Sequence, residues 1–374
     1  MTVAAVMVSG CVVGGKQVRS EISNSAIPLP IHERSMTVEP WQFGSLLGWE
    51  VSLPRDAMRS KASLQSWIAS TKGQGTNTLF LQRSLFERGS NLQWNDLVRE
   101  AHRQQVRVYA VVNLREKLFE GNSHRGWSDI RLNSDSGVLR PSGSPDLLHP
   151  EFQESIKRTS LGLATAGVDL IVFRFDPPSG PFDGFSHYGL EGFQRDFHYS
   201  LSPRKLFTSA DRQRTQNAPR SLPVAQDRGQ FSPEFWRWAG WKNREYLSVL
   251  DSVMAAVRQK QPRARFGIEL HTDTMLNPRQ ALVGYTEDFL EARQRLFDRF
   301  IVAVSEPGVH GEVSPFIGQA AMKMTELLDD PAMVFVLVSG RKPMWSTAKE
   351  ALNIKTSLGL QQGVGLGFRG HNVP

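Results

Sequence analysis

The stretch Gly167–Asp176 reads GVDLIVFRFD, a nearly continuous apolar run that ends in an acid. Such a run is typical of a strand in a parallel sheet, because helices cover both faces of that sheet. The run Val168–Phe175 within it is one of eight along the chain. The others are Phe43–Trp49, Thr78–Gln82, Val106–Asn113, Arg265–Leu270, Phe300–Val304, Met333–Val338 and Gly363–Phe368.

Longer amphipathic segments separate these runs, with apolar residues at three- and four-residue spacing. They are Ala62–Lys72, Trp94–Gln104, Glu151–Ala166, Pro233–Lys260, Arg279–Phe297, Ile317–Leu328 and Ser346–Ser357. Alternating strands and helices predict βαβ units and an α/β fold. Eight strands, with no glycine-rich phosphate turn after the first, favour a closed (β/α)8 TIM barrel over an open doubly wound sheet. We therefore predict a single barrel domain over residues 41–374.

One long segment, Pro177–Gln230, interrupts this alternation after the fourth predicted strand. It is rich in Gly, Pro, Ser, Arg and aromatic residues. Loops at the carboxyl end of barrel strands build the site, so a long loop insertion here is expected to shape a cleft or a lid. The alternative is a decoration without a role, mostly over Ser200–Gln230.

The N-terminus contains Cys11, the one cysteine of the chain, at the end of an apolar stretch. The motif Val8-Ser9-Gly10-Cys11 resembles a bacterial lipobox, in which small residues precede the lipidated cysteine. This predicts a lipoprotein signal peptide over residues 1–10, lipidation at Cys11 and a tether over residues 11–40. Val12 in place of Asp after the cysteine favours the outer membrane, facing the periplasm, by the same resemblance. The alternative is a buried strand that ends in an ordinary cysteine.

The composition is that of a globular protein, with 40% hydrophobic and 22% charged residues. The net charge of +7 suits contact with anionic lipid or acidic polysaccharide, or aids solubility. Because the charge is scattered and the leader indicates export, we predict no nucleic-acid partner. The sequence has no P-loop, His-Glu-x-x-His pair or Gly-x-Ser-x-Gly elbow, and its histidines lack metal-ligand spacing. We therefore predict neither a cofactor nor a metal.

Residues just past each barrel strand point into a common mouth, and several of them are acids. Cleavage of a glycosidic bond needs one carboxylic acid and one carboxylate on opposite sides of the sugar. Asp176 and Glu269 are the best pair, since neighbouring strands lie about 5 Å apart. The alternatives are a loop cap for Asp176 and an ion pair with Arg174 for Glu269.

The remaining residues at the predicted mouth are candidate substrate contacts. Trp49 and Trp345 offer flat faces on which a sugar can stack. Glu50 and Glu306 are reserve carboxylates. Arg83, Asn113, His271, Asp273 and Arg341 complete the set. The tryptophans of Phe235–Trp241 fit either sugar stacking or packing against the barrel wall.

Four motifs, in order and at matching spacing, resemble one bacterial family. They are Gly167–Asp176, Trp238-x-x-Trp241-Lys242, Phe266-Gly267-Ile268 and Leu276-Asn277-Pro278 leading to Glu287–Leu290. From about Ser45 onward the chain resembles the C-terminal glycoside hydrolase domain of the PgaB family of poly-β-1,6-N-acetylglucosamine deacetylases. It is also similar to related glycoside-hydrolase-like barrels. The resemblance implies a barrel, a carbohydrate ligand and an outer-membrane lipoprotein.

The resemblance matches Asp176 to an acid of the family's strand-four motif. Phe175 replaces a second acid of that motif, Arg174 replaces a histidine, and Glu269 stands where the family tends to have a neutral polar residue. Deacetylation is not implied. A cationic glucosamine polymer also suits a basic protein poorly.

The sequence thus leads to two hypotheses. The first is a lipid-anchored glycoside hydrolase that cleaves a bacterial polysaccharide, acidic or neutral rather than cationic. The second is a catalytically inactive barrel that binds exopolysaccharide or supports export machinery in the cell envelope. The altered strand-four motif favours the second.

Overall fold

The computed structural model describes residues 46–51, 60–83, 91–116, 125–134, 136–207, 231–303, 315–340 and 348–370. The chain divides into two units, Met1–Pro40 and Trp41–Pro374. All described residues belong to the second unit. The predicted leader, lipidation at Cys11 and tether lie outside the described residues, as do Glu306, Arg341 and Trp345. These assignments stay predictions.

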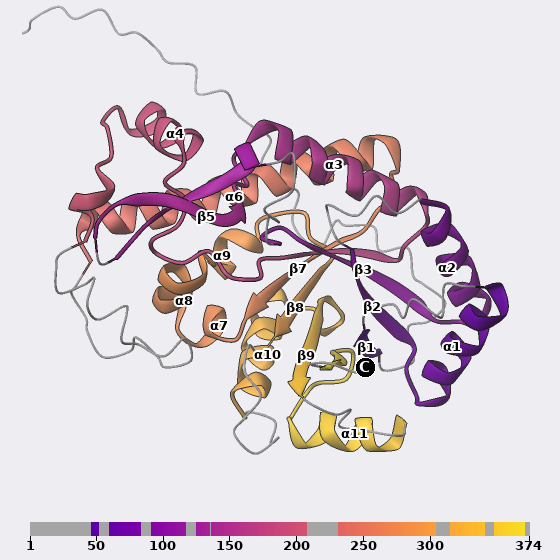
Figure 1. The fold of residues 1–374 in the computed structure, drawn as a ribbon. Coiled ribbons are helices and arrows are strands. Elements are labelled where there is room, and N and C mark those ends of the chain that lie inside the picture. The colour runs from indigo at the N-terminus through magenta and orange to yellow at the C-terminus, as the bar shows by residue number, and fades with distance from the viewer. Residues whose placement is uncertain are drawn as a thin grey trace, which may run out of the picture. The chain divides into compact units, whose positions relative to one another are not determined.

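Eight parallel strands close into a barrel, which confirms the predicted (β/α)8 fold (Figure 1). The order around the barrel is β1-β10-β9-β8-β7-β6-β3-β2, and β1 pairs with both β2 and β10. The strands are β1 (Leu47–Val51), β2 (Thr78–Arg83), β3 (Arg107–Asn113), β6 (Leu170–Arg174), β7 (Phe266–His271), β8 (Arg299–Ala303), β9 (Val334–Gly340) and β10 (Gly365–Gly370). Each of the eight predicted runs therefore overlaps a barrel strand.

Helices alternate with the strands and surround the barrel (Figure 1). They are α1 (Lys61–Gly73), α2 (Asn91–Arg103), α3 (Pro150–Thr165), α6 (Pro233–Lys260), α7 (Asp273–Leu276), α8 (Pro278–Tyr285), α9 (Phe289–Ala292), α10 (Pro315–Leu328) and α11 (Ala348–Ser357). The start of α6 follows from its sequence, because the Ser232 side chain accepts the Phe235 N–H and Pro233 stands in the first turn. None of the described helices is long and apolar enough to cross a membrane.

One helix prediction is wrong. The segment Arg279–Phe297, expected as one helix, breaks after Tyr285 into α8 and α9. Thr286 adopts a left-handed conformation with φ of 58°, and its hydroxyl donates to the Ser179 carbonyl at 2.7 Å. This break turns Glu287 back toward β7, where it contacts His271.

Phe335 fills the interior of the barrel. Its ring packs against Phe80 at 4.9 Å between centroids. A Cβ atom at Gly48, Gly365 or Gly367 would come within 2.7, 2.2 or 2.6 Å of the Phe335 ring. The three glycines on β1 and β10 therefore make room for this side chain, and the interior is a packed core rather than a channel.

Two insertions project from the barrel. The first, between β3 and α3, is an antiparallel hairpin of β4 (Ser128–Leu132) and β5 (Leu139–Pro145) that the sequence did not predict. The second is the predicted insertion after the fourth barrel strand, β6. Its described part contains α4 (His187–Phe197) and a 3-10 helix, Pro203–Lys205. In Figure 1, β5 and α4 lie near the same part of α6.

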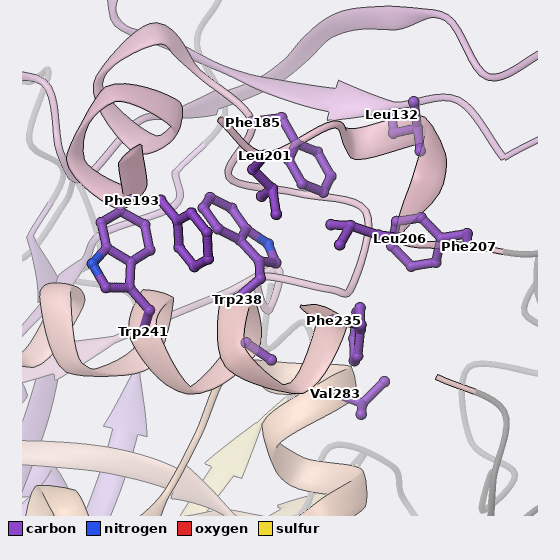
Figure 2. Close-up of a cluster of buried hydrophobic side chains, with 11 residues drawn as sticks. Leu132, Phe185, Phe193, Leu201, Leu206, Phe207, Phe235, Trp238, Trp241 and Val283 are labelled. Atoms are coloured by element: carbon purple, nitrogen blue, oxygen red, sulfur yellow. The ribbon is translucent and has the colours of Figure 1, made fainter. Parts of the chain in front are cut away.

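An aromatic cluster joins α6 to the second insertion (Figure 2). Trp238 is fully buried, stacks on Phe185 with centroids 5.2 Å apart, and lies 5.1 Å from the Trp241 ring. Phe193 of α4 packs edge-on against both tryptophans. Of the two interpretations left open for these tryptophans, the structure supports packing, since Trp238 and Trp241 have no face free for a sugar.

Candidate active site at the mouth of the barrel

Four charged side chains form a closed ring at the carboxyl ends of the barrel strands. We call Glu50 of β1, Arg174 of β6, Glu269 of β7 and Arg369 of β10 the mouth ring. Arg174 donates two hydrogen bonds of 2.7 Å to the two oxygens of Glu50 and one of 2.8 Å to Glu269. Arg369 donates to the same two glutamates, at 2.8 and 2.7 Å. Each carboxylate is therefore shared by both guanidinium groups.

The mouth ring keeps both glutamates ionised. Burial by itself raises the pKa of Glu50, but the charges of Arg174 and Arg369 outweigh it and lower that pKa to about 2. Burial and the same two arginines act on Glu269, whose pKa is also lowered. Both groups are ionised at neutral pH, so neither has a proton to donate to a leaving group. Glu269 thus lies at the mouth as predicted, in the ion pair with Arg174 that was its alternative.

Asp176 is exposed and follows β6 directly. Asn113, buried at the end of β3, holds its backbone from both sides. The Asn113 amide donates to the Asp176 carbonyl at 2.6 Å, and its oxygen accepts the Asp176 N–H at 3.1 Å. Within the described part of the chain, no side chain pairs with the Asp176 carboxylate. An ion pair between Asp176 and Arg174 is not formed, because Arg174 binds Glu50 and Glu269.

His271 ends β7 two residues after Glu269, on the same side of the strand. Its Nδ1 lies 2.7 Å from Oε1 of Glu287, and its ring stacks on Tyr285 with centroids 4.0 Å apart. The second oxygen of Glu287 accepts the His271 N–H at 2.9 Å and also the Thr274 hydroxyl. Burial lowers the pKa of His271, but the Glu287 carboxylate more than compensates, so the pKa lies above its ordinary value.

The other predicted contacts are divided between the mouth and the outer side of the barrel. Asp273 lies near the mouth at the start of α7, where it accepts hydrogen bonds from Asn277 at 3.0 Å and Tyr285 at 3.3 Å. Glu50 on β1 and Phe80 on β2 face the inside of the barrel. Trp49 is one residue before Glu50, and Arg83 is three residues after Phe80. Successive strand residues face opposite sides, so both point toward the helices rather than the mouth.

A second charged cluster holds the segment that follows Asp176. We call Arg115, Asp129, Arg131, Asp183 and Lys242 the insertion network. Arg115 contacts Asp129 at 3.2 Å and Asp183 at 3.3 Å, and donates to the Pro177 carbonyl at 3.1 Å. Lys242 of α6 donates to the carbonyls of Gly180 and Asp183 at 3.0 and 3.2 Å. The network thereby fixes residues 177–183 against β4 and α6.

Sequence reasoning missed three members of this site. Arg174 entered only as a partner for Glu269, while Arg369 and Glu287 received no role. A charged residue within an apolar strand indicates that a partner of opposite charge is buried beside it. This signal could have identified Arg174 as a member of the site. Among the described residues, no group of three or more His, Cys, Asp or Glu side chains is arranged to hold a metal ion.

No known protein family and no curated protein matches the chain by sequence. Solved structures do match its fold. The glycoside hydrolase domain of PgaB (BpsB) from Bordetella bronchiseptica is 16% identical, with a TM-score of 0.60, over 87% of this chain and 93% of that one. The chain shares the barrel fold of that domain. The resemblance to the PgaB family is thus confirmed at the level of fold.

Two other glycoside hydrolases show the same likeness. The catalytic domain of a β-amylase from Paenibacillus polymyxa is 9% identical, with a TM-score of 0.54, over 87% of this chain and 92% of that one. A β-galactosidase from Rahnella sp. R3 is 13% identical, with a TM-score of 0.56, over 87% of this chain and 50% of that one. At such identities the likeness concerns the fold alone, and the activity of this chain depends on the residues at the mouth of its barrel.

Proposed function

We propose that this protein is a glycoside hydrolase that cleaves a bacterial polysaccharide at the mouth of its barrel, with Asp176 as a catalytic carboxylate. The observation that carries the proposal is the state of Asp176. Its carboxylate is exposed and unpaired within the described residues, while Asn113 fixes its backbone at 2.6 and 3.1 Å. A fixed backbone and a free carboxylate are what a group that acts on substrate requires.

The mouth ring restricts the role of Glu269. With its pKa lowered by Arg174 and Arg369, Glu269 is a carboxylate at neutral pH. It cannot protonate a leaving oxygen, and its negative charge is balanced by the two arginines. We therefore keep Glu269 in the site as a group that holds these arginines at the mouth, and we assign the base chemistry to Asp176.

Charge and motif support the substrate class and location. The net charge of +7 favours an acidic or neutral polysaccharide over a cationic one. The lipobox-like motif ending at Cys11 is the support for a lipid-anchored protein in the cell envelope, at the outer membrane and facing the periplasm. The same location would bring it near export machinery.

The neutralised mouth ring favours a second candidate function. Glu50 and Glu269 are paired with arginine and Glu287 with His271, so Asp176 is the exposed, unpaired carboxylate among the described residues there. A barrel with this mouth could bind polysaccharide without cleaving it, since hydrolysis needs two acid–base groups.

Chain shortening of a panel of acidic, neutral and cationic bacterial exopolysaccharides separates the two candidates. The panel is incubated with the wild-type protein and with Asp176→Asn, and polymer length is followed by size-exclusion chromatography. Hydrolysis of one polymer by the wild type alone, with binding kept in the variant, supports the hydrolase. Retention of a polymer by both proteins without shortening would instead establish the binding barrel.

A further inference from the structure

A hydrolase of this kind needs a proton donor, and the two mouth glutamates cannot supply one. Both accept hydrogen bonds from two arginines, and the pKa of Glu50 is lowered to about 2. Asp176, in the role proposed above, acts as the base. Among the described residues at the mouth, the remaining group that exchanges a proton near neutral pH is the imidazole of His271.

The geometry around His271 fixes both the orientation and the proton arrangement of its ring. Glu287 accepts at Nδ1 from 2.7 Å, and this carboxylate is itself anchored by the His271 backbone N–H and the Thr274 hydroxyl. Tyr285 stacks on the ring face at an interplanar angle of 10°. A carboxylate at Nδ1 directs the second nitrogen, Nε2, outward as the group that exchanges protons.

His271 and Asp176 lie at the carboxyl ends of neighbouring strands. β6 and β7 are paired, with Phe173 opposite Ile268. His271 is the last residue of β7, and Asp176 follows the end of β6 at Arg174 by two residues. The His271 side chain is 19% exposed, so part of it is open to solvent.

The charged groups around His271 come from its own strand β7, from β10, from α7 and from the segment between α8 and α9. Glu287 and Glu269 raise its pKa, while burial and Arg369 lower it. Asp273 lies on α7 and binds the Tyr285 hydroxyl at 3.3 Å. The net effect is a pKa above the ordinary value of an imidazole.

We infer that His271 is the catalytic proton donor of the proposed hydrolase and that Glu287 is its positioning residue. The inference rests on the proposed function. In the step, the bond from the anomeric carbon to the leaving oxygen breaks with its electron pair on oxygen, and that oxygen takes the proton from Nε2 of His271. Water adds its hydroxyl to the anomeric carbon and gives its proton to Asp176. Asp176 then releases its proton to solvent, and solvent returns a proton to His271.

A leaving-group comparison tests this role. The substrates are the polymer that the wild type shortens and a 2,4-dinitrophenyl glycoside of the same sugar, whose leaving group needs no protonation. We expect His271→Gln to slow polymer cleavage by about 10²–10⁴-fold and to slow dinitrophenol release far less. The loss of activity at high pH, which marks deprotonation of the donor, should vanish in this variant. Glu287→Gln should move it to lower pH, because the carboxylate that raises the pKa is gone.

His102→Gln is the matched control. His102 also pairs with a carboxylate, Asp169, at 2.8 Å, but it lies at the end of α2, on the opposite side of the barrel from the mouth. Its rates and pH profile should equal those of the wild type. Equal loss on both substrates, or an unshifted profile in Glu287→Gln, would overturn the donor role alone. A wild-type protein that shortens no polymer overturns the proposed function and, with it, this inference.

Discussion

The mouth ring and the insertion network both pair buried acidic and basic side chains, yet the pKa values of their carboxyl groups differ. In the mouth ring, Arg174 and Arg369 each bond to both Glu50 and Glu269, and the pKa of both glutamates is lowered. In the insertion network, burial raises the pKa of Asp129 to about 7, and the Arg115 charge only partly offsets it.

The number of cations per carboxylate explains the difference. Asp183 contacts both Arg115 and Arg131, and its pKa is lowered although it is fully buried. Asp129 pairs with Arg115 alone and lies near the acids Asp146 and Asp183, which raise its pKa further. Within these two clusters, the carboxylates with two guanidinium partners have a lowered pKa, and Asp129, with one, has a raised pKa. The mouth ring is fixed in charge, whereas the insertion network titrates near neutrality.

Removal of a shared guanidinium should have the largest effect. In Arg174→Met two buried carboxylates lose a common partner, so we expect the free energy of unfolding to fall by about 3–5 kcal/mol. Urea unfolding followed by circular dichroism measures this change. A loss below about 1 kcal/mol would mean that the ring is more solvated than its contacts indicate.

The pH dependence of stability should run in opposite directions for the two regions. Glu50 has a folded pKa of about 2 against an ordinary 4.5, so its contribution is present above pH 4.5 and is lost as pH falls toward 2. Asp129 has a folded pKa of about 7 against 3.8, so the folded state binds the extra proton and loses stability as pH rises from 3.8 through 7.

Melting temperatures of two variants over pH 3–8 test these signs. The melting temperature of the wild type relative to that of Glu50→Gln should fall as pH falls below 4.5. The melting temperature of the wild type relative to that of Asp129→Asn should fall as pH rises toward 7. If both differences respond to pH in the same direction, the contrast between the two regions fails.

A surface ion pair should show the smallest effect and calibrates the other two. Arg99 and Asp96 form a pair on α2, with side chains 72% and 60% exposed. We expect Arg99→Met to change the free energy of unfolding by less than about 1 kcal/mol, because solvent screens exposed charges. The same urea titration provides the measurement. A cost close to that of Arg174→Met would show that burial is not what makes the ring strong.

The barrel was predictable because each strand is buried on both faces and therefore reads as an apolar run. The hairpin of β4 and β5 was not, since β5 reads LRPSGSP and begins with three exposed residues, so no apolar run marks it. The break at Thr286 also lacks a local signal, because it depends on a hydrogen bond to the distant Ser179 carbonyl.

For the site, strand ends predicted the position of Glu269, Asn113 and His271 at the mouth, and the alternative for Glu269 named its partner Arg174. The partners of Asn113 and His271 were not predicted. Trp49 was assigned to the mouth because β1 was expected to end at this residue. The strand instead continues to Val51, so Trp49 lies within it and, by alternation with Glu50, points toward the helices. Glu287 reaches His271 from another segment, sixteen residues along the chain. Ion pairs between distant strands, such as Arg174 with Glu50, depend on closure of the barrel and are not readable from local sequence.

The rate at which Asp176→Asn releases new reducing ends from the cleaved polymer tests the central claim most directly. Glu154→Gln, a change of an exposed acid on α3, is the matched control. The account predicts that Asp176→Asn falls by at least about 10²-fold while its melting temperature and polymer binding stay near those of the wild type. A variant that cleaves within a factor of about two of the wild type would contradict the assignment of Asp176.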